Sequence, residues 1–196
     1  MRKSMNCFLP VAVAALLLTG VSPAFAQDTP KAEVSVGYNW LAAKESGDDD
    51  LVDTDWEKFP KGFYGDIAAN ISDTLSIVGQ YTGNFKTFDD DSKLTVQTFM
   101  GGIRGSSPGN IRGFGQVLLG GATVKAEDEA FAFEESETNF ALQIGGGVNV
   151  LAGGRVGLRV GVDYLRLFAK DDSLLFFEDV NGFRFNVGVT FGIGSR

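Results

Sequence analysis

The chain has 196 residues, of which 25 are acidic and 17 basic, with no histidine and a single cysteine. The net charge of −8 excludes the basic surface that binding to a nucleic-acid backbone requires. Without histidine the chain also lacks serine–histidine–aspartate catalysis and histidine-ligated zinc, so we expect neither an enzyme nor a cofactor.

The first 26 residues follow the pattern of a secretory signal peptide. Two basic residues and an apolar stretch of about a dozen residues precede a small-x-small cleavage signal at residues 24–26. We therefore expect export, removal of residues 1–26 together with Cys7, and one mature domain over residues 27–196; a retained membrane anchor is the alternative. The mature chain keeps 15 basic and all 25 acidic residues, for a formal charge of −10.

Alternation of apolar and polar side chains predicts eight strands in the mature chain. In the last of them Phe183, Phe185 and Val187 share one parity while Arg184 and Asn186 share the other, as the two-residue period of a strand requires. Several segments exceed the roughly 5–6 residues of a soluble strand and reach the roughly 9–11 that a tilted transmembrane strand needs. The expected strands cover residues 33–41, 62–71, 75–85, 93–104, 111–125, 138–150, 155–167 and 181–193.

The fourth expected strand has the weakest alternation. Leu94 and Val96 lie on the parity opposite to Phe99 and Ile103. This break indicates either a bulge or a change of environment near Thr98. The even number of strands still allows the sheet to close on itself.

The connections between the expected strands alternate between short and long. With the N-terminus in the periplasm, every short connection faces the periplasm and every long one the outside, which is the asymmetry of outer-membrane barrels. The long connections carry 20 of the 25 acidic residues. Carboxylates suit Ca²⁺ or Mg²⁺, but charge runs favour a solvated, repulsive surface, and metal binding stays an open question. The short connections are residues 72–74, 106–110 and 152–154, and the long ones residues 42–61, 86–92, 126–137 and 168–180.

The two parities of the expected strands differ in chemistry. One parity is apolar and carries aromatic rings near the long connections, where a membrane interface favours them. The other carries charges beside glycines, which suits the narrow interior of an eight-stranded barrel. We expect Asp66 and Asp163 to neutralise lumen arginines rather than to form a catalytic pair, because buried charges must be paired. The expected interface aromatics are Trp40, Phe63, Phe85, Phe140, Tyr164 and Phe183, and the expected lumen charge network comprises Asp66, Arg112, Arg159, Asp163 and Arg184.

Three segments of the chain resemble a known family. Residues 140–150, residues 155–166 (RVGLRVGVDYLR) and residues 183–191 (FRFNVGVTF) are similar to the bacterial outer-membrane β-barrel domain family, which includes outer membrane protein A-like and small porin-family proteins. The resemblance extends over essentially the whole mature chain. It implies an all-β, eight-stranded antiparallel up-and-down transmembrane β-barrel in the outer membrane of a Gram-negative bacterium, inserted by the outer-membrane assembly machinery.

These patterns together predict a monomeric outer-membrane β-barrel with a structural or surface-interaction role and a side-chain-filled lumen. The expected partners are outer-membrane lipids, lipopolysaccharide and the assembly machinery, with no nucleic acid. A narrow passive porin-like channel for small solutes is the first alternative, and a soluble periplasmic barrel that binds an apolar ligand is the second. Channel and plug differ in whether the lumen charges pair, which the strand pattern leaves open.

Overall fold

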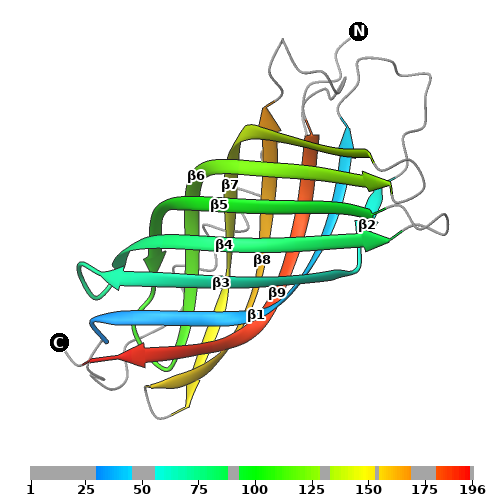
Figure 1. The fold of residues 1–196 in the computed structure, drawn as a ribbon. Coiled ribbons are helices and arrows are strands. Elements are labelled where there is room, and N and C mark those ends of the chain that lie inside the picture. Colours follow the sequence, from blue (N-terminus) through cyan, green and yellow to red (C-terminus); the bar gives the residue numbers. More distant parts are fainter. Residues whose placement is uncertain are drawn as a thin grey trace, which may run out of the picture.

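The computed structural model describes residues 30–45, 56–87, 93–128, 133–152, 155–168 and 180–194, and its elements there are all β-strands (Figure 1). The expected signal peptide lies outside the described residues. None of the described residues belongs to a helix long and apolar enough to cross a membrane. The strands are β1 (Ala32–Glu45), β2 (Glu57–Phe59), β3 (Lys61–Asn70), β4 (Leu75–Thr87), β5 (Lys93–Ser106), β6 (Ile111–Asp128), β7 (Phe133–Ala152), β8 (Val156–Phe168) and β9 (Val180–Ile193).

The strands form a closed antiparallel barrel in chain order (Figure 1). β9 pairs with β1 along its whole length, from Ala32 opposite Ile193 to Glu45 opposite Val180. Register partners can be followed around the barrel from Glu33 on β1 through β3, β4, β5, β6, β7, β8 and β9. This path returns to β1 at Ala43, ten residues beyond its start. This shear inclines the strands to the barrel axis by roughly 35–45°.

The second barrel strand is interrupted at Pro60, which divides it into β2 and β3. Tyr38 pairs with Phe63 and Leu41 with Phe59, so two residues of β1 face three residues of the interrupted strand. Proline has no N–H group for the ladder, and the extra residue forms a bulge. Phe59 therefore points inward, with 3% of its surface exposed, whereas Phe63 is 45% exposed outside. The nine labelled strands thus occupy eight barrel positions, and the predicted eight-stranded up-and-down barrel is confirmed.

Of the two interpretations of the weak alternation near Thr98, the bulge is wrong. β5 pairs without interruption on both sides, with Thr98 opposite Thr82 in β4 and opposite Ala122 in β6. The inward face of β5 instead changes from charged at Arg104 to apolar at Val96, and both side chains are buried. The change of environment, which was the other interpretation, accounts for the weak alternation.

β6 and β7 also extend beyond their predicted ends. Their pairing runs from Ile111 opposite Val150 to Asp128 opposite Phe133. Most of the segment expected as a long connection, residues 126–137, is therefore strand. Backbone hydrogen bonding continues there without apolar alternation, because a strand that leaves the membrane needs no lipid-facing side.

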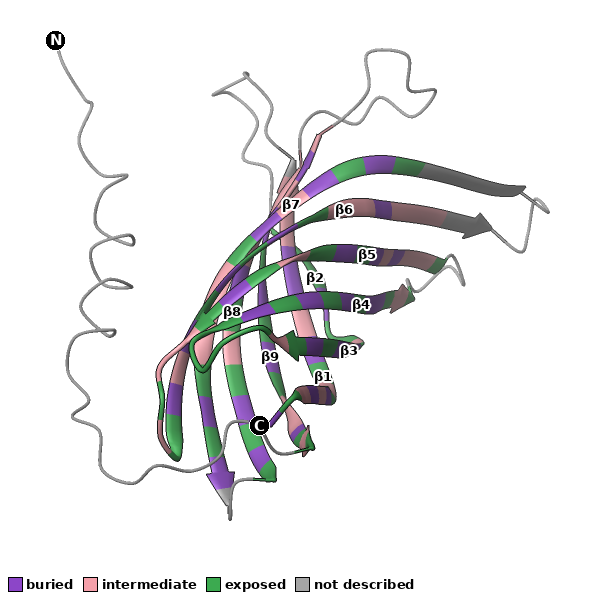
Figure 2. Cartoon of the chain, turned by 90° about the vertical axis from the view of Figure 1, so that its left-hand side faces the viewer, coloured by how far each residue is buried: buried purple, intermediate pink, exposed green. Residues whose placement is uncertain are grey.

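Burial alternates along the long strands (Figure 2). The outward side chains are mostly apolar, and the buried polar and charged side chains point inward. Ile67, Phe99 and Leu158 are 63%, 73% and 62% exposed on the outer surface. Asp66 and Arg159, which are sequence neighbours of two of them, are 3% and 2% exposed inside. A soluble barrel would bury its apolar side, so this facing contradicts the periplasmic carrier and agrees with insertion in lipid.

Several glycines permit neighbouring strands to approach closely. At Gly147 an added Cβ would lie 2.1 Å from the Val160 carbonyl oxygen and 2.6 Å from the Gly161 Cα. Gly79 lies on the outer surface, where an added Cβ would meet nothing within 4 Å. The first site therefore requires glycine and the second does not.

We expect Gly147→Ala to lower the free energy of unfolding by about 1–3 kcal/mol, because the new methyl group must push two backbones apart. Urea titration in lipid vesicles measures the change. Gly79→Ala is the matched control and should leave the free energy of unfolding within about 0.5 kcal/mol of the wild type. Equal midpoints for the two variants would show that β7 and β8 do not approach as closely as the structure places them.

Candidate functional site

The charged side chains of the lumen gather in the half of the barrel next to the short turns. Asp66, in the middle of β3, accepts hydrogen bonds from Arg104 Nη1 at 3.3 Å and Nη2 at 3.0 Å. Its second oxygen also accepts from Arg159 Nη1 at 2.5 Å. All three side chains are 2–3% exposed. One carboxylate therefore holds two guanidinium groups in a site without solvent, where charge-assisted hydrogen bonds are strongest.

Glu33 extends this arrangement toward the periplasmic end. Its Oε1 accepts a hydrogen bond from Arg112 Nη1 at 2.8 Å, and its Oε2 lies 3.7 Å from Arg159 Nη2. Arg159 Nε also donates to Asn149 Oδ1 at 2.7 Å. The guanidinium carbons of Arg104 and Arg159 lie 5.2 and 5.0 Å from the centre of the Phe114 ring. Both distances are within the range of cation–π attraction, so the Phe114 ring stabilises the two positively charged guanidinium groups.

Asp163 joins the network through neutral amides. Its two oxygens accept from Gln116 Nε2 at 2.9 Å and from Asn186 Nδ2 at 2.5 Å. Gln116 Oε1 in turn accepts from Arg104 Nε at 3.0 Å and Nη2 at 2.8 Å. The ion pairs and these amides form one connected set across β1, β3, β5, β6, β8 and β9.

Arg184 lies apart from this network. It is fully buried, and its Nη1 donates to Gln143 Oε1 at 3.0 Å, while Gln143 Nε2 donates to Gln80 Oε1 at 2.8 Å. Its Nε and Nη2 atoms have no hydrogen-bond partner among the described residues. Asp163 is its direct register partner but forms no ion pair with it. Of the five predicted lumen charges, the structure brings four together and leaves Arg184 among amides.

The lumen charge network predicted from the sequence lacked two of its charged members, Glu33 and Arg104. Glu33 is the first residue of its expected strand, and Arg104 ends the strand whose facing the suspected bulge left unsettled. Both lie on the inward parity of their strands. Extending the alternation to the strand ends would have identified the two charges, because an inward charge has no access to water and needs a partner.

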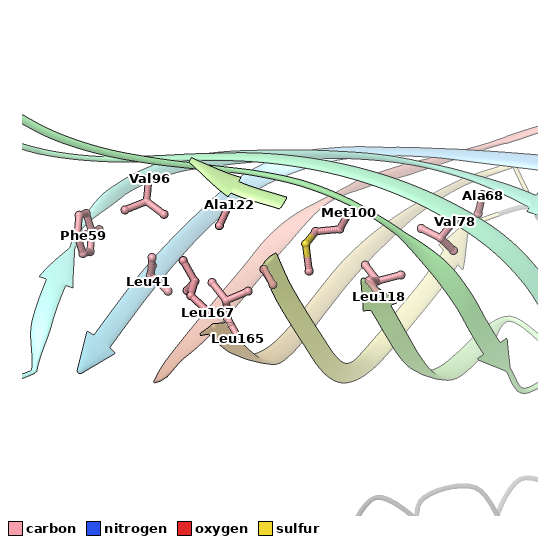
Figure 3. Close-up of a cluster of buried hydrophobic side chains, with 11 residues drawn as sticks. Leu41, Phe59, Ala68, Val78, Val96, Met100, Leu118, Ala122, Leu165 and Leu167 are labelled. Carbon is pink, nitrogen blue, oxygen red and sulfur yellow. The ribbon is translucent and has the colours of Figure 1, made fainter. Parts of the chain in front are cut away.

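A cluster of buried apolar side chains also fills part of the interior (Figure 3). Leu41, Phe59, Val96, Ala122 and Leu167 point inward from the strand halves next to the long connections, and each is at most 7% exposed. This second layer was not predicted from the sequence. The complete buried cluster is Leu41, Phe59, Ala68, Val78, Val96, Met100, Leu118, Ala122, Ala141, Leu165 and Leu167.

The predicted interface aromatics all lie on the outer surface near the long connections and contact other rings. Trp40 lies 5.4 Å from Phe185 between ring centres. Phe63 contacts Tyr81 and Phe85 at 5.8 and 6.0 Å. Phe140 pairs with Phe168 at 5.7 Å and Tyr164 with Phe183 at 5.5 Å. Such pairs add about 0.5–1.5 kcal/mol beyond area burial, so the belt also stabilises the barrel.

The structure gives no metal site in the part of the chain that it describes. No group of three or more potential metal-ligating side chains occurs among those residues. The acidic segments 46–55, 88–92, 129–132 and 169–179 lie outside the described residues.

Comparisons with known proteins give one consistent fold. The family model for the outer membrane protein beta-barrel domain matches residues 11–191. The crystal structure of Neisserial surface protein A (NspA) is 17% identical, with 83% of this chain and 97% of that chain covered and a TM-score of 0.59. Ail, the attachment invasion locus protein of Yersinia pestis, in complex with the heparin analogue sucrose octasulfate, is 17% identical over 83% and 99% of the two chains, with a TM-score of 0.56. A search of curated proteins finds no match.

Proposed function

This chain belongs to the outer membrane protein beta-barrel domain family of bacterial outer membranes, and from that membership we propose that it is a closed barrel with a structural or surface-interaction role. The barrel anchors the protein in lipid and carries its long connections to the cell surface. It has no catalytic role, and it acts as a monomer. The partner is recognised by the connections and not by the lumen.

One observation carries this proposal: two layers fill the lumen. The ion pairs of Asp66 and Glu33 with three arginines occupy the periplasmic half, and the apolar cluster, apart from Ala68 and Val78 near the short turn 72–74, occupies the rest. Eight strands leave an interior only about wide enough for side chains. A conducting pore needs charges that face water, whereas Arg104, Arg159 and Arg184 are at most 2% exposed.

The charge of the connections indicates the kind of surface partner. Ail was crystallised with a heparin analogue, which is a polyanion. The long connections expected here contain 20 of the 25 acidic residues, so they repel a partner of that kind. We therefore propose a neutral or cationic surface partner for this chain, with lipopolysaccharide and other outer-membrane lipids around the barrel wall.

Ion conductance tests the closed lumen. We expect the refolded barrel to give no steady single-channel openings in planar bilayers, because ion pairs and packed apolar side chains leave no continuous water path. A general porin incorporated in the same bilayers is the positive control. Steady openings of uniform size in wild-type protein would instead support the passive channel.

A further inference from the structure

The basic residues outside the lumen are concentrated at one end of the barrel. Among the described residues, only Lys31 and Arg155 lie at the short-turn end. Those at the long-connection end lie on the outward side of their strands, just beyond the aromatic belt. They are Lys44, Lys58, Lys61, Lys93, Lys125 and Arg166.

The barrel closes at a seam where β9 pairs with β1 (Figure 1). The register places cations and aromatic rings in successive rows across this seam. The outer row is centred on Asn181 of β9. Its register partners are Arg166 on β8 and Lys44 on β1. Lys44 and Lys58 are diagonal neighbours on β1 and β2, about 7–8 Å apart at Cα. The next row toward the membrane consists of Tyr164, Phe183, Ala42 and Lys58.

Contacts hold the rings of this region in place. Trp56, just before β2, reaches Phe183 with 5.9 Å between ring centres and remains 43% exposed. Tyr164 lies 5.5 Å from the same ring and donates its hydroxyl to Asn181 Oδ1 at 2.6 Å. We call the set Lys44, Trp56, Lys58, Tyr164, Arg166 and Phe183 the seam patch.

The described residues on the opposite side of the barrel do not repeat this combination. On β5, β6 and β7 the outward positions at a similar level are Gln97, Thr123 and Thr138, which are register neighbours. Thr123 and Thr138 share a hydrogen bond of 2.9 Å between their hydroxyl oxygens. Lys93 and Lys125 lie on this side, and none of the ring pairs among the described residues is on β5 or β6. The seam patch is therefore local and not a property of the whole rim.

We propose that the seam patch is a binding site for a phosphorylated glycolipid of the outer leaflet. Lysine ammonium groups just beyond the aromatic belt lie at the depth of lipid phosphates, and each contributes attraction to an anionic surface. The exposed face of Trp56 suits a sugar ring, and acyl chains fit along Phe185 and Val187 below, which are 49% and 51% exposed. Glu57, an acid beside the patch, forms an ion pair with Lys86. This inference rests on the outer-membrane location in the proposed function but not on the closed lumen.

Tryptophan fluorescence reports on this site, because the chain has two tryptophans, Trp40 and Trp56, and both lie near it. The wild type in nonionic detergent is titrated with lipid A, with dephosphorylated lipid A and with phosphatidylglycerol. We expect saturable binding of lipid A and at least about tenfold weaker binding of the other two, since the phosphate and the sugar both contribute.

Two double variants separate a site from general charge attraction. Lys44→Gln with Lys58→Gln should weaken lipid A binding about tenfold, while Lys93→Gln with Lys125→Gln on the far side should keep wild-type affinity. Unchanged gel mobility with and without heating checks that both are folded. Equal loss in the two double variants, equal affinity for phosphatidylglycerol, or no saturable binding would each overturn the site. Conductance of the same samples tests the closed lumen separately, so either conclusion can fail alone.

Discussion

Replacing Asp66 by alanine is expected to lower the free energy of unfolding by about 3–5 kcal/mol, the largest effect that we predict for a single substitution. Asp66 accepts hydrogen bonds from both Arg104 and Arg159 in a site without solvent. Its removal leaves two buried guanidinium groups beside Phe114 without their shared carboxylate. Urea titration of the barrel refolded in lipid vesicles measures the loss.

An exposed acid provides the control for this substitution. Asp73 lies in the short connection between β3 and β4, and Asp73→Ala should change the free energy of unfolding by less than about 0.5 kcal/mol. Asp66→Glu keeps the charge and should recover part of the stability. If Asp66→Ala lowered the free energy of unfolding by less than about 1 kcal/mol, water would reach the arginines. The charge network would then not close the lumen.

Val160→Arg is expected to cost about 2–4 kcal/mol in a bilayer, because a charge at the depth of the hydrocarbon midplane is unfavourable on a lipid-facing strand. Val160 is 59% exposed and lies in the middle of β8, opposite Val148 and Val187. Val156, at the end of the same strand, is also exposed but lies close to the periplasmic interface. Val156→Arg should therefore cost only about 0–1 kcal/mol.

The same titration in vesicles compares the two valine variants. A depth-dependent difference is the signature of lipid contact, since a water-exposed surface accepts arginine equally well at both positions. Equal stability of Val160→Arg and wild type would contradict the assignment of the apolar side to lipid.

Much of the fold is predictable because strand alternation is a local signal. The parity of residues 181–193 alone indicates an apolar and a polar side, and the structure places them toward lipid and lumen. The bulge at Pro60 was not predicted, because the segment before residue 62 was assigned to a connection. The apolar inward positions of β5, such as Val96, left a bulge and a change of environment as alternatives, since alternation alone does not show that the lumen itself changes from polar to apolar.

The pairing within the lumen depends on information that the sequence pattern does not contain. Arg159 and Asp66 are 93 residues apart and meet because the barrel closes with a particular shear. Their shared inward parity was predictable, but their height along the axis follows from the register of every intervening strand. The same register leaves Arg184 beside Gln143 instead of a carboxylate.

Thiol accessibility at the centre of the barrel tests the closed lumen most directly. The only cysteine, Cys7, precedes residue 27, so residues 27–196 carrying Gln143→Cys have a single thiol at a position that is fully buried in the lumen. A small charged methanethiosulfonate reagent is added to the folded barrel in detergent micelles, where both ends are accessible, with Thr74→Cys in an exposed turn as the control. We predict that the lumen thiol stays unmodified while the control reacts completely. Reaction of Gln143→Cys at the rate of the control would contradict a closed barrel.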